Sequence, residues 1–261
     1  MIKIKKVSAA LILAGLSVAS LPAFSMPVLS TELIQNGGFE SFGNDVYSIT
    51  AWNTAEDGIL GSVLVENDSA TDASGRNTVG AASGSYYGLL DSAAPSNQAL
   101  YQTFNTGAVS SATLSFQMFI NNQSSNGTQI HASGLDYTTG GSFDSNQHVR
   151  VDLLSAGTSA FSTNSADILQ SLYLGGSNGS SVIGGDVANP YLTYSFNLSS
   201  MLATGGAYTL RFASVTNDAQ MQFGIDNVSL SVTPVPEPET YAMFLAGLGL
   251  MGFVARRRNK V

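Results

Sequence analysis

The sequence predicts an all-β fold, a β-sandwich or jelly roll of about ten strands. Apolar and polar residues alternate along several runs, among them 112–120 and 207–215. Clusters of Gly, Ser and Asn separate these runs, and no long amphipathic helical pattern occurs between the two chain ends. Period-two alternation bounded by turn residues is typical of half-buried strands. Many such strands without long helices favour two packed sheets.

The chain begins with the pattern of a secretory signal peptide. Three lysines in the first six residues precede an apolar stretch of small residues at 7–21. Ala23 and Ser25 then form a small-x-small cleavage site. A basic start, a short apolar run and such a site direct a protein to export. We therefore expect residues 1–25 to be removed after Ser25.

Residues 26–232 form the predicted body, which is long enough for one domain with a substantial core. Sixteen acidic residues lie between Glu32 and Asp226 against three arginines, a formal charge of −13 by difference. Nucleic acids and anionic lipids need basic patches, so the composition excludes them as partners. Divalent cations and neutral polymers remain. The chain has no cysteine, which excludes disulfides and thiolate ligands.

The predicted strands follow one another with polar loops between them. They are 33–40, 60–66, 85–91, 98–104, 112–120, 148–154, 191–198, 207–215 and 220–232. The segment 166–174 has an ambiguous pattern, and 199–202 is compatible with a helical turn. Long loops rich in Ser, Gly and Asn at 121–146 and 175–189 are expected to be functional or mobile.

The last predicted strand contains a change of phase. Its apolar residues are odd-numbered from 221 to 225 and even-numbered from 228 to 232. A β-bulge at Asp226 and Asn227 accounts for this change, because a bulge re-aims the side chains beside it.

The two ends of the body resemble carbohydrate-binding modules of the galactose-binding-domain-like jelly-roll superfamily. The matching residues are NGGFE at 36–40, then Trp52, and IDNVSL at 225–230. The resemblance implies that the first and last strands lie close together and that a structural Ca²⁺ binds there. Glu40 and Asp226 are its implied acidic ligands, and hard oxygen donors suit this ion. The alternative is a polar strand end with solvated carboxylates.

Three aromatic residues are candidates for contact with a sugar. Trp52, Tyr86 and Tyr87 offer flat rings, which are good contact surfaces in binding sites. Adjacent tyrosines point to opposite faces of a strand, so only one of the two is expected to be buried. For Trp52 the sequence favours a role as a core residue near the first strand over a sugar contact.

The sequence does not predict an enzyme. No serine lies in a nucleophile motif with the required strand and helix around it. His131 and His148 without cysteine make a poor zinc site. Pairs of carboxylates hydrolyse glycosides, so a secreted glycoside hydrolase stays open as an alternative.

Residues 233–261 form a tail in three parts. It contains Pro236, Glu237 and Pro238, then the uncharged run 240–255, and then Arg256, Arg257 and Arg258. As a helix the run of 16 residues is about 24 Å long, against a hydrocarbon core of about 30 Å. We expect it to span the inner membrane with snorkelling arginines on the cytoplasmic side.

This order of Pro-Glu-Pro, apolar helix and basic end resembles the PEP-CTERM sorting signal of Gram-negative bacteria. The resemblance implies recognition by an exosortase, removal of the helix and an association with exopolysaccharide. We therefore predict an exported protein, first a membrane-anchored precursor and then part of the cell surface or extracellular matrix. Its jelly-roll body is expected to bind, or to be embedded in, exopolysaccharide. A passive structural or adhesion protein without sugar specificity is the second hypothesis.

Overall fold

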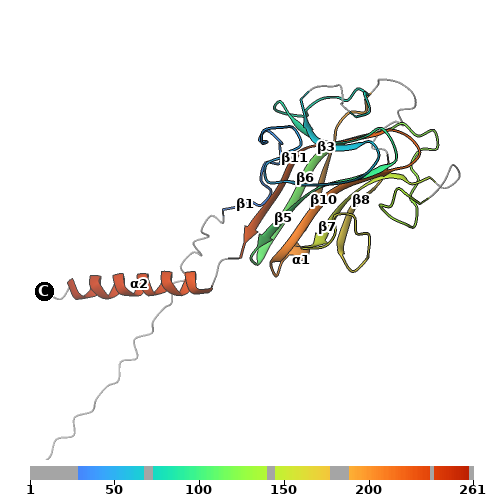
Figure 1. The fold of residues 1–261 in the computed structure, drawn as a ribbon. Helices are drawn as coiled ribbons and strands as arrows, with labels where there is room; N and C mark the ends of the chain where they lie inside the picture. Colours follow the sequence, from blue (N-terminus) through green and yellow to red (C-terminus); the bar gives the residue numbers. More distant parts are fainter. Residues whose placement is uncertain (1–28, 68–72, 140–144, 177–187, 236–237, 259–261) are drawn as a thin grey trace, which may run out of the picture.

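A computed structural model of the chain describes residues 29–67, 73–139, 145–176, 188–235 and 238–258. The predicted signal peptide at 1–25 lies outside these residues, as do Pro236 and Glu237 of the predicted sorting signal. The body is a sandwich of two antiparallel sheets, which confirms the predicted fold class (Figure 1).

The first sheet has six strands, and β11 lies at its centre. Its strand order is β3-β4-β11-β6-β9, and β1 pairs with the later part of β11. The bounds are β1 Thr31–Glu32, β3 Gly61–Glu66, β4 Tyr87–Ser92, β6 Val109–Asn122, β9 Leu192–Asn197 and β11 Met221–Pro234. Because β1 and β11 pair directly, the two ends of the body meet in this sheet, as the sequence predicts.

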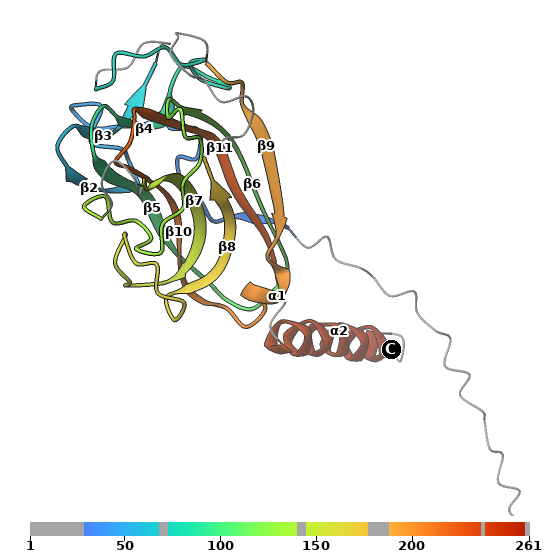
Figure 2. The same cartoon turned by 90° about the vertical axis from the view of Figure 1, so that its right-hand side faces the viewer.

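The second sheet has five strands in the order β2-β5-β10-β7-β8 (Figure 2). The bounds are β2 Asn53–Gly58, β5 Ser96–Thr106, β7 Gln147–Ser155, β8 Ile168–Gly175 and β10 Gly206–Thr216. The ambiguous segment is thus a strand, and the short helix α1, Ser199–Leu202, forms at the predicted helical turn.

The hydrophobic core lies between the sheets. Alternate residues of the long strands β5, β6, β7, β10 and β11 face inward, and aromatic rings from both sheets meet there. Phe212 of β10 packs edge-on against Phe116 of β6, with ring centroids 5.1 Å apart, and also contacts Phe223 of β11. These contacts explain why the period-two patterns fold into two facing layers.

A second layer of side chains covers the outer face of the five-stranded sheet. Leu135, from the long loop after β6, packs on Ala99, Ala213 and Val215 of β5 and β10. Residues of the loop after β7, among them Phe161, pack against the same cluster. This sheet is therefore covered on both faces in the region of β5 and β10.

The first predicted strand is wrong in its position. The segment 33–40 forms turns instead, because Asn36 and Phe39 adopt positive φ angles of 51° and 58°. The strand β2 was not predicted, since its polar sequence NTAEDG lacks the alternation of a half-buried strand.

The predicted bulge is confirmed: the β11–β6 register shifts between Asp226 and Ser229, and Asn227 has φ 54°.

The tail forms one helix, α2, Pro238–Arg258. It contains Pro238 and the three predicted arginines of the sorting signal. The run 240–255, for which the sequence predicts a membrane span, lies within this helix. Among the residues that the structure describes, no helix is both long and apolar enough to cross a membrane.

Candidate functional site

The bulge in β11 directs the buried Asp226 towards the segment that precedes β4. Oδ2 of Asp226 accepts hydrogen bonds from the backbone N–H groups of Ala82, at 2.9 Å, and Ser83, at 3.0 Å. Oδ1 accepts the N–H of Asn227 at 2.6 Å. A carboxylate without the bulge would continue in phase with the strand, so the change of register is what brings Asp226 to this segment.

Glu40 holds the next two residues of the same segment. Its Oε1 accepts the N–H groups of Ser85, at 2.7 Å, and Tyr86, at 2.9 Å. Gly84 lies between the two pairs with φ +68°, and a Cβ there would approach Oε1 of Glu40 to 2.1 Å. We call Glu40 and Asp226 the carboxylate clamp, because together they fix residues 82–86 through four backbone N–H groups.

The charge of the clamp is balanced by these donors. Burial raises the pKa of Asp226, and the negative charge of Glu40 raises it further. The N–H groups of Ser83, Asn227 and Ala82 lower this pKa by stabilising the carboxylate. Two acids from opposite ends of the body are thus neighbours, as the sequence predicts.

The described contacts of the clamp are all with backbone N–H groups. Calcium takes six to eight oxygen ligands, whereas both oxygens of Asp226 and Oε1 of Glu40 already accept N–H groups. Within the described ranges, no three His, Cys, Asp or Glu residues lie close enough to hold a metal ion. Calcium at Glu40 and Asp226 therefore stays a prediction, and the described contacts assign the pair to loop fixation.

The predicted aromatic platform is corrected for two of its three residues. Trp52 is only 6% exposed: it packs against Phe39 and Phe212, and its Nε1–H donates to the carbonyl of Asn36. Tyr87 is fully buried. Neither ring has a face available to a sugar, because Trp52 belongs to the core between the sheets and Tyr87 to a smaller buried cluster.

Tyr86 remains partly exposed, and its ring meets Phe42 edge-on with centroids 4.9 Å apart. The pair Tyr86 and Tyr87 thus follows the predicted alternation of strand faces. Of the three predicted rings, Tyr86 alone retains an accessible surface.

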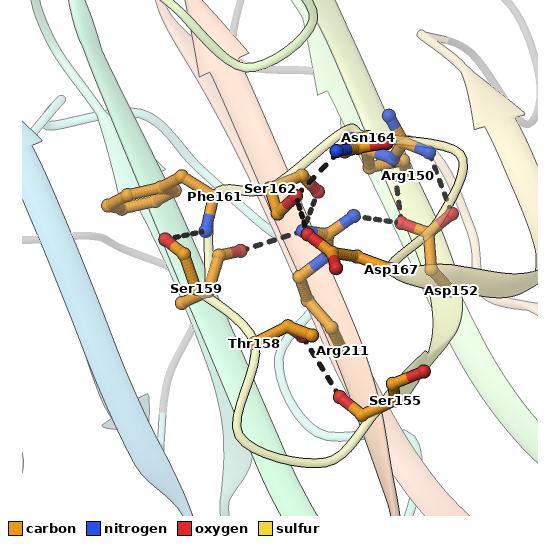
Figure 3. A network of polar contacts seen from close by, with 11 residues as sticks. Arg150, Asp152, Ser155, Thr158, Ser159, Phe161, Ser162, Asn164, Asp167 and Arg211 are labelled. Atoms are coloured by element: carbon orange, nitrogen blue, oxygen red, sulfur yellow. Dashed lines mark hydrogen bonds and ion pairs between the residues drawn. The ribbon is translucent and has the colours of Figure 1, made fainter.

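The sequence did not predict a buried ionic network on the outer face of the five-stranded sheet. Arg150 and Asp152 of β7 form a bidentate pair, with Nε–Oδ2 at 2.6 Å and Nη2–Oδ1 at 2.9 Å. The guanidinium of Arg211, on the neighbouring β10, donates to the same carboxylate (Figure 3). Cross-strand register causes this meeting, since Arg211 lies opposite Asp152.

Arg211 also holds the loop that follows β7. Its Nη1 donates to the carbonyl oxygens of Ala160, at 2.8 Å, and Ser162, at 2.7 Å. Figure 3 shows the loop curving over the guanidinium. The side chain is fully buried, and burial lowers its pKa while Asp152 raises it. The network therefore attaches the loop to the sheet.

A shallow cavity of about 450 Å³ opens beside the last residues of β5, where β2 no longer pairs with that strand. Its lining consists of Glu32, Leu33, Gln35, Ala51, Gln102, Thr103, Phe104 and Asn105. Amides and one carboxylate supply most of its polar groups, and no cationic side chain is among the lining residues. Such groups exchange hydrogen bonds with hydroxyl-rich molecules.

The side-chain amides of the cavity differ in whether they already have hydrogen-bond partners in the protein. Gln102 is fixed, because its Oε1 accepts the N–H of Gln35 and its Nε2 donates to the carbonyl of the same residue. The side chains of Gln35 and Asn105 are exposed and have no hydrogen-bond partner among the described residues. These two amides are available to a ligand. No motif marks the cavity, since its residues come from separate segments.

One known motif matches the tail of the chain. Residues 234–258 match the PEP-CTERM protein-sorting motif, and no curated protein matches the chain. The motif indicates an exported protein that an exosortase processes and that belongs to the cell surface.

Several solved structures are similar to the body at low sequence identity. The carbohydrate-binding module TmCBM61, solved with β-1,4-galactotriose, is 12% identical with a TM-score of 0.42, over 77% of this chain and 97% of that one. The K3 adhesin domain of Lys-gingipain from Porphyromonas gingivalis is 13% identical with a TM-score of 0.44, over 78% and 100%. Tailspike protein 4 of bacteriophage CBA120 is 12% identical with a TM-score of 0.41, and the chain covers 21% of its length.

Proposed function

We propose that this exported, exosortase-processed protein binds neutral exopolysaccharide through the cavity beside β5. The observation that carries the proposal is the composition of the cavity, in which free amides and a carboxylate surround a space without cationic groups. The body is rich in acidic residues. An acidic body favours a neutral polymer over a polyanion, because like charges repel.

Free side chains make the cavity suitable for a sugar. Gln35 and Asn105 each offer a carbonyl oxygen and an NH₂ group, which match the donor and acceptor character of a hydroxyl. Phe104 and Leu33 add apolar surface to the lining, as binding sites for small ligands commonly require. The rigid pair of Gln35 backbone and Gln102 side chain fixes one wall in advance, which lowers the entropy cost of binding.

We propose a binding role and not catalysis. A glycoside hydrolase needs two carboxyl groups free to flank the scissile bond. Asp226 and Glu40 hold backbone N–H groups, and Asp152 pairs with two arginines. Glu32 of the cavity likewise accepts the N–H groups of Ile34 and Leu230 through Oε1. These occupied carboxylates support the binding role.

The test is co-sedimentation of the processed protein with the producer's own polysaccharide. We expect the wild-type protein to sediment with the polymer and Asn105→Ala combined with Gln35→Ala to lose most of this binding. Asn77→Ala removes another exposed amide far along the chain from the cavity and should bind like the wild type. Equal binding of all three proteins would contradict the proposed site.

Competition separates specific binding from a passive matrix role. Defined neutral oligosaccharides should release the wild-type protein from the polymer. Binding that no oligosaccharide reduces would favour a structural or adhesion protein without sugar specificity. Release of new reducing ends from the polymer would instead support the hydrolase alternative.

A further inference from the structure

The four outer strands of the two sheets differ in how their edges are protected. In β3 the N–H of Val63 donates to Oε1 of Glu56 at 2.5 Å, and the N–H of Val65 donates to the carbonyl of Val46 at 2.8 Å. The edge strand β2 carries Glu56 and Asp57. Covering segments and charges are the usual means of preventing strands from pairing between molecules.

On the opposite side of the sandwich, the described residues supply neither protection. There β8 and β9 form the outer edges of the two layers (Figure 2), and neither sequence contains a charged residue or proline. Tyr173 of β8 and Tyr194 of β9 contact each other with ring centroids 5.8 Å apart. Leu174 and Leu192 are 45% and 42% exposed on the same two strands. Among the described residues, β9 therefore presents apolar groups on a strand whose outer edge pairs with no other strand.

The hydrogen-bond pattern identifies which backbone groups of β9 are free. The N–H of Leu198 donates to the carbonyl of Ala112 on β6 at 2.9 Å. Hydrogen-bonding direction alternates along an antiparallel strand, so the N–H and C=O groups of Tyr194 and Phe196 also point towards β6. Those of Thr193 and Ser195 point outward, and no described residue pairs with them.

The strand β9 is a better template for pairing than β8. It pairs with β6 in continuous register over its whole length, Leu192–Asn197. The β7–β8 register is interrupted twice, between Val151 and Asp152 and between Leu153 and Leu154. Bulges twist an edge away from a partner, so a straight partner strand fits β9 alone.

We propose that β9 pairs antiparallel with β9 of a second copy of this chain and joins two six-stranded sheets into one. An antiparallel edge is self-complementary about a two-fold axis. The excess of sixteen acids over three arginines makes two bodies repel each other, so copies of this chain can meet closely only where charge is absent. The strand β9 has no charged residue, and two copies therefore pair here without like charges facing each other. The proposal is independent of glycan binding, since the cavity lies beside β5.

The test uses Ser195→Pro in the exported, processed protein. Proline at this position removes an outward N–H and leaves the ladder to β6 intact. Sedimentation equilibrium without polysaccharide should give a dimer for the wild type and a monomer for the variant. Ser195→Lys places a charge on the same edge and should also give a monomer.

The control is Ser125→Lys, which adds the same charge at an exposed loop residue outside β9. It should remain a dimer. Far-ultraviolet circular dichroism and thermal unfolding check that both Ser195 variants are folded, so a loss of fold is not mistaken for a loss of pairing. A monomeric wild type at its highest soluble concentration, or a dimer that survives both Ser195 substitutions, would overturn the proposal.

Discussion

Arg211 is a charged side chain that is fully enclosed by protein, and its partners explain why it is tolerated there. It shares Asp152 with Arg150 and donates to two loop carbonyls. A buried ion of this kind is stabilising only while all its partners are present. Its removal leaves acceptors without donors, whose desolvation is no longer compensated.

We therefore expect Arg211→Met to lower the free energy of unfolding by about 3 kcal/mol, within the range for breaking a buried ion pair. Urea unfolding followed by Trp52 fluorescence measures this change, since the indole lies in the core. Arg76→Met is the matched control: Arg76 is half-buried and bonds Gln220. It should cost about 1 kcal/mol, as for an ordinary hydrogen bond. Equal losses would contradict the special role of Arg211.

Individual residues were predictable where a local pattern marked them. The change of parity around Asp226 required a bulge, and the bulge is present. The ionic network had no such mark, because Arg150 and Asp152 are separated by 61 and 59 residues from Arg211 and meet it only through the register of β7 and β10. For Trp52 the sequence favours the core over a sugar contact, and the buried ring confirms that role.

At the scale of elements, the carboxylate clamp links the turn at 36–40, the bulge of β11 and the segment before β4. Asp226→Asn should loosen this segment, because both carboxylate oxygens accept backbone N–H groups and the NH₂ group of the amide would face one set of these donors in either orientation. We expect a loss of about 1–3 kcal/mol, the cost of unsatisfied buried groups. Amide hydrogen exchange at residues 82–86 should become faster in the variant.

Glu40→Gln is the control for this change, because its remaining carbonyl oxygen can still accept the N–H groups of Ser85 and Tyr86. It should have a smaller effect than Asp226→Asn.

The clamp also predicts the same unfolding temperature in calcium and in chelator, since backbone donors already satisfy the carboxylates. A large loss of stability in chelator would support the calcium site that the sequence predicts.

Elements with strong alternation were found where the sequence predicts them, but those defined by tertiary contacts were not. The central strands β6, β10 and β11 carry clear inward faces. The strand predicted at 33–40 was wrong, because positive φ angles at Asn36 and Phe39 are incompatible with a continuous strand there. The edge strand β2 has no buried face to produce a pattern. A strand becomes an edge strand through its pairing in the folded sheet, and the sequence of the strand does not show that pairing.

At the scale of the whole molecule, His148 should make stability depend on pH. Burial lowers its pKa to about 4 from 6.5, and Arg150 lowers it too, while the Gln129 backbone and Asp152 oppose this. Both ring nitrogens are buried, and neither has a hydrogen bond of normal geometry to a residue that the structure describes, so the Gln129 backbone is only a weak partner. The neutral ring is therefore the form that the folded state favours. In the unfolded chain, the ring of His148 binds a proton once the pH falls below 6.5, its ordinary pKa.

The sign of the effect follows from proton binding. Between pH 6.5 and 4 the unfolded chain holds more protons than the folded one, so acid favours unfolding. The stabilising contribution is complete above pH 6.5. It falls by about 2 kcal/mol at pH 5 and about 3 kcal/mol at pH 4, at 1.36 kcal/mol per unit of pKa. Asp226 acts in the opposite direction, because burial raises its pKa.

Urea unfolding at pH 7 and pH 5 measures this term, and His148→Leu removes it. We expect the difference in unfolding free energy between the two pH values to shrink by about 2 kcal/mol in the variant. Val149→Ala is the control, because it perturbs the packing of β7 next to His148 without removing a titratable group. Its pH difference should match that of the wild type. Because the comparison is between pH values of one protein, packing changes cancel, and an unchanged difference in His148→Leu would assign the acid sensitivity to the carboxylates instead.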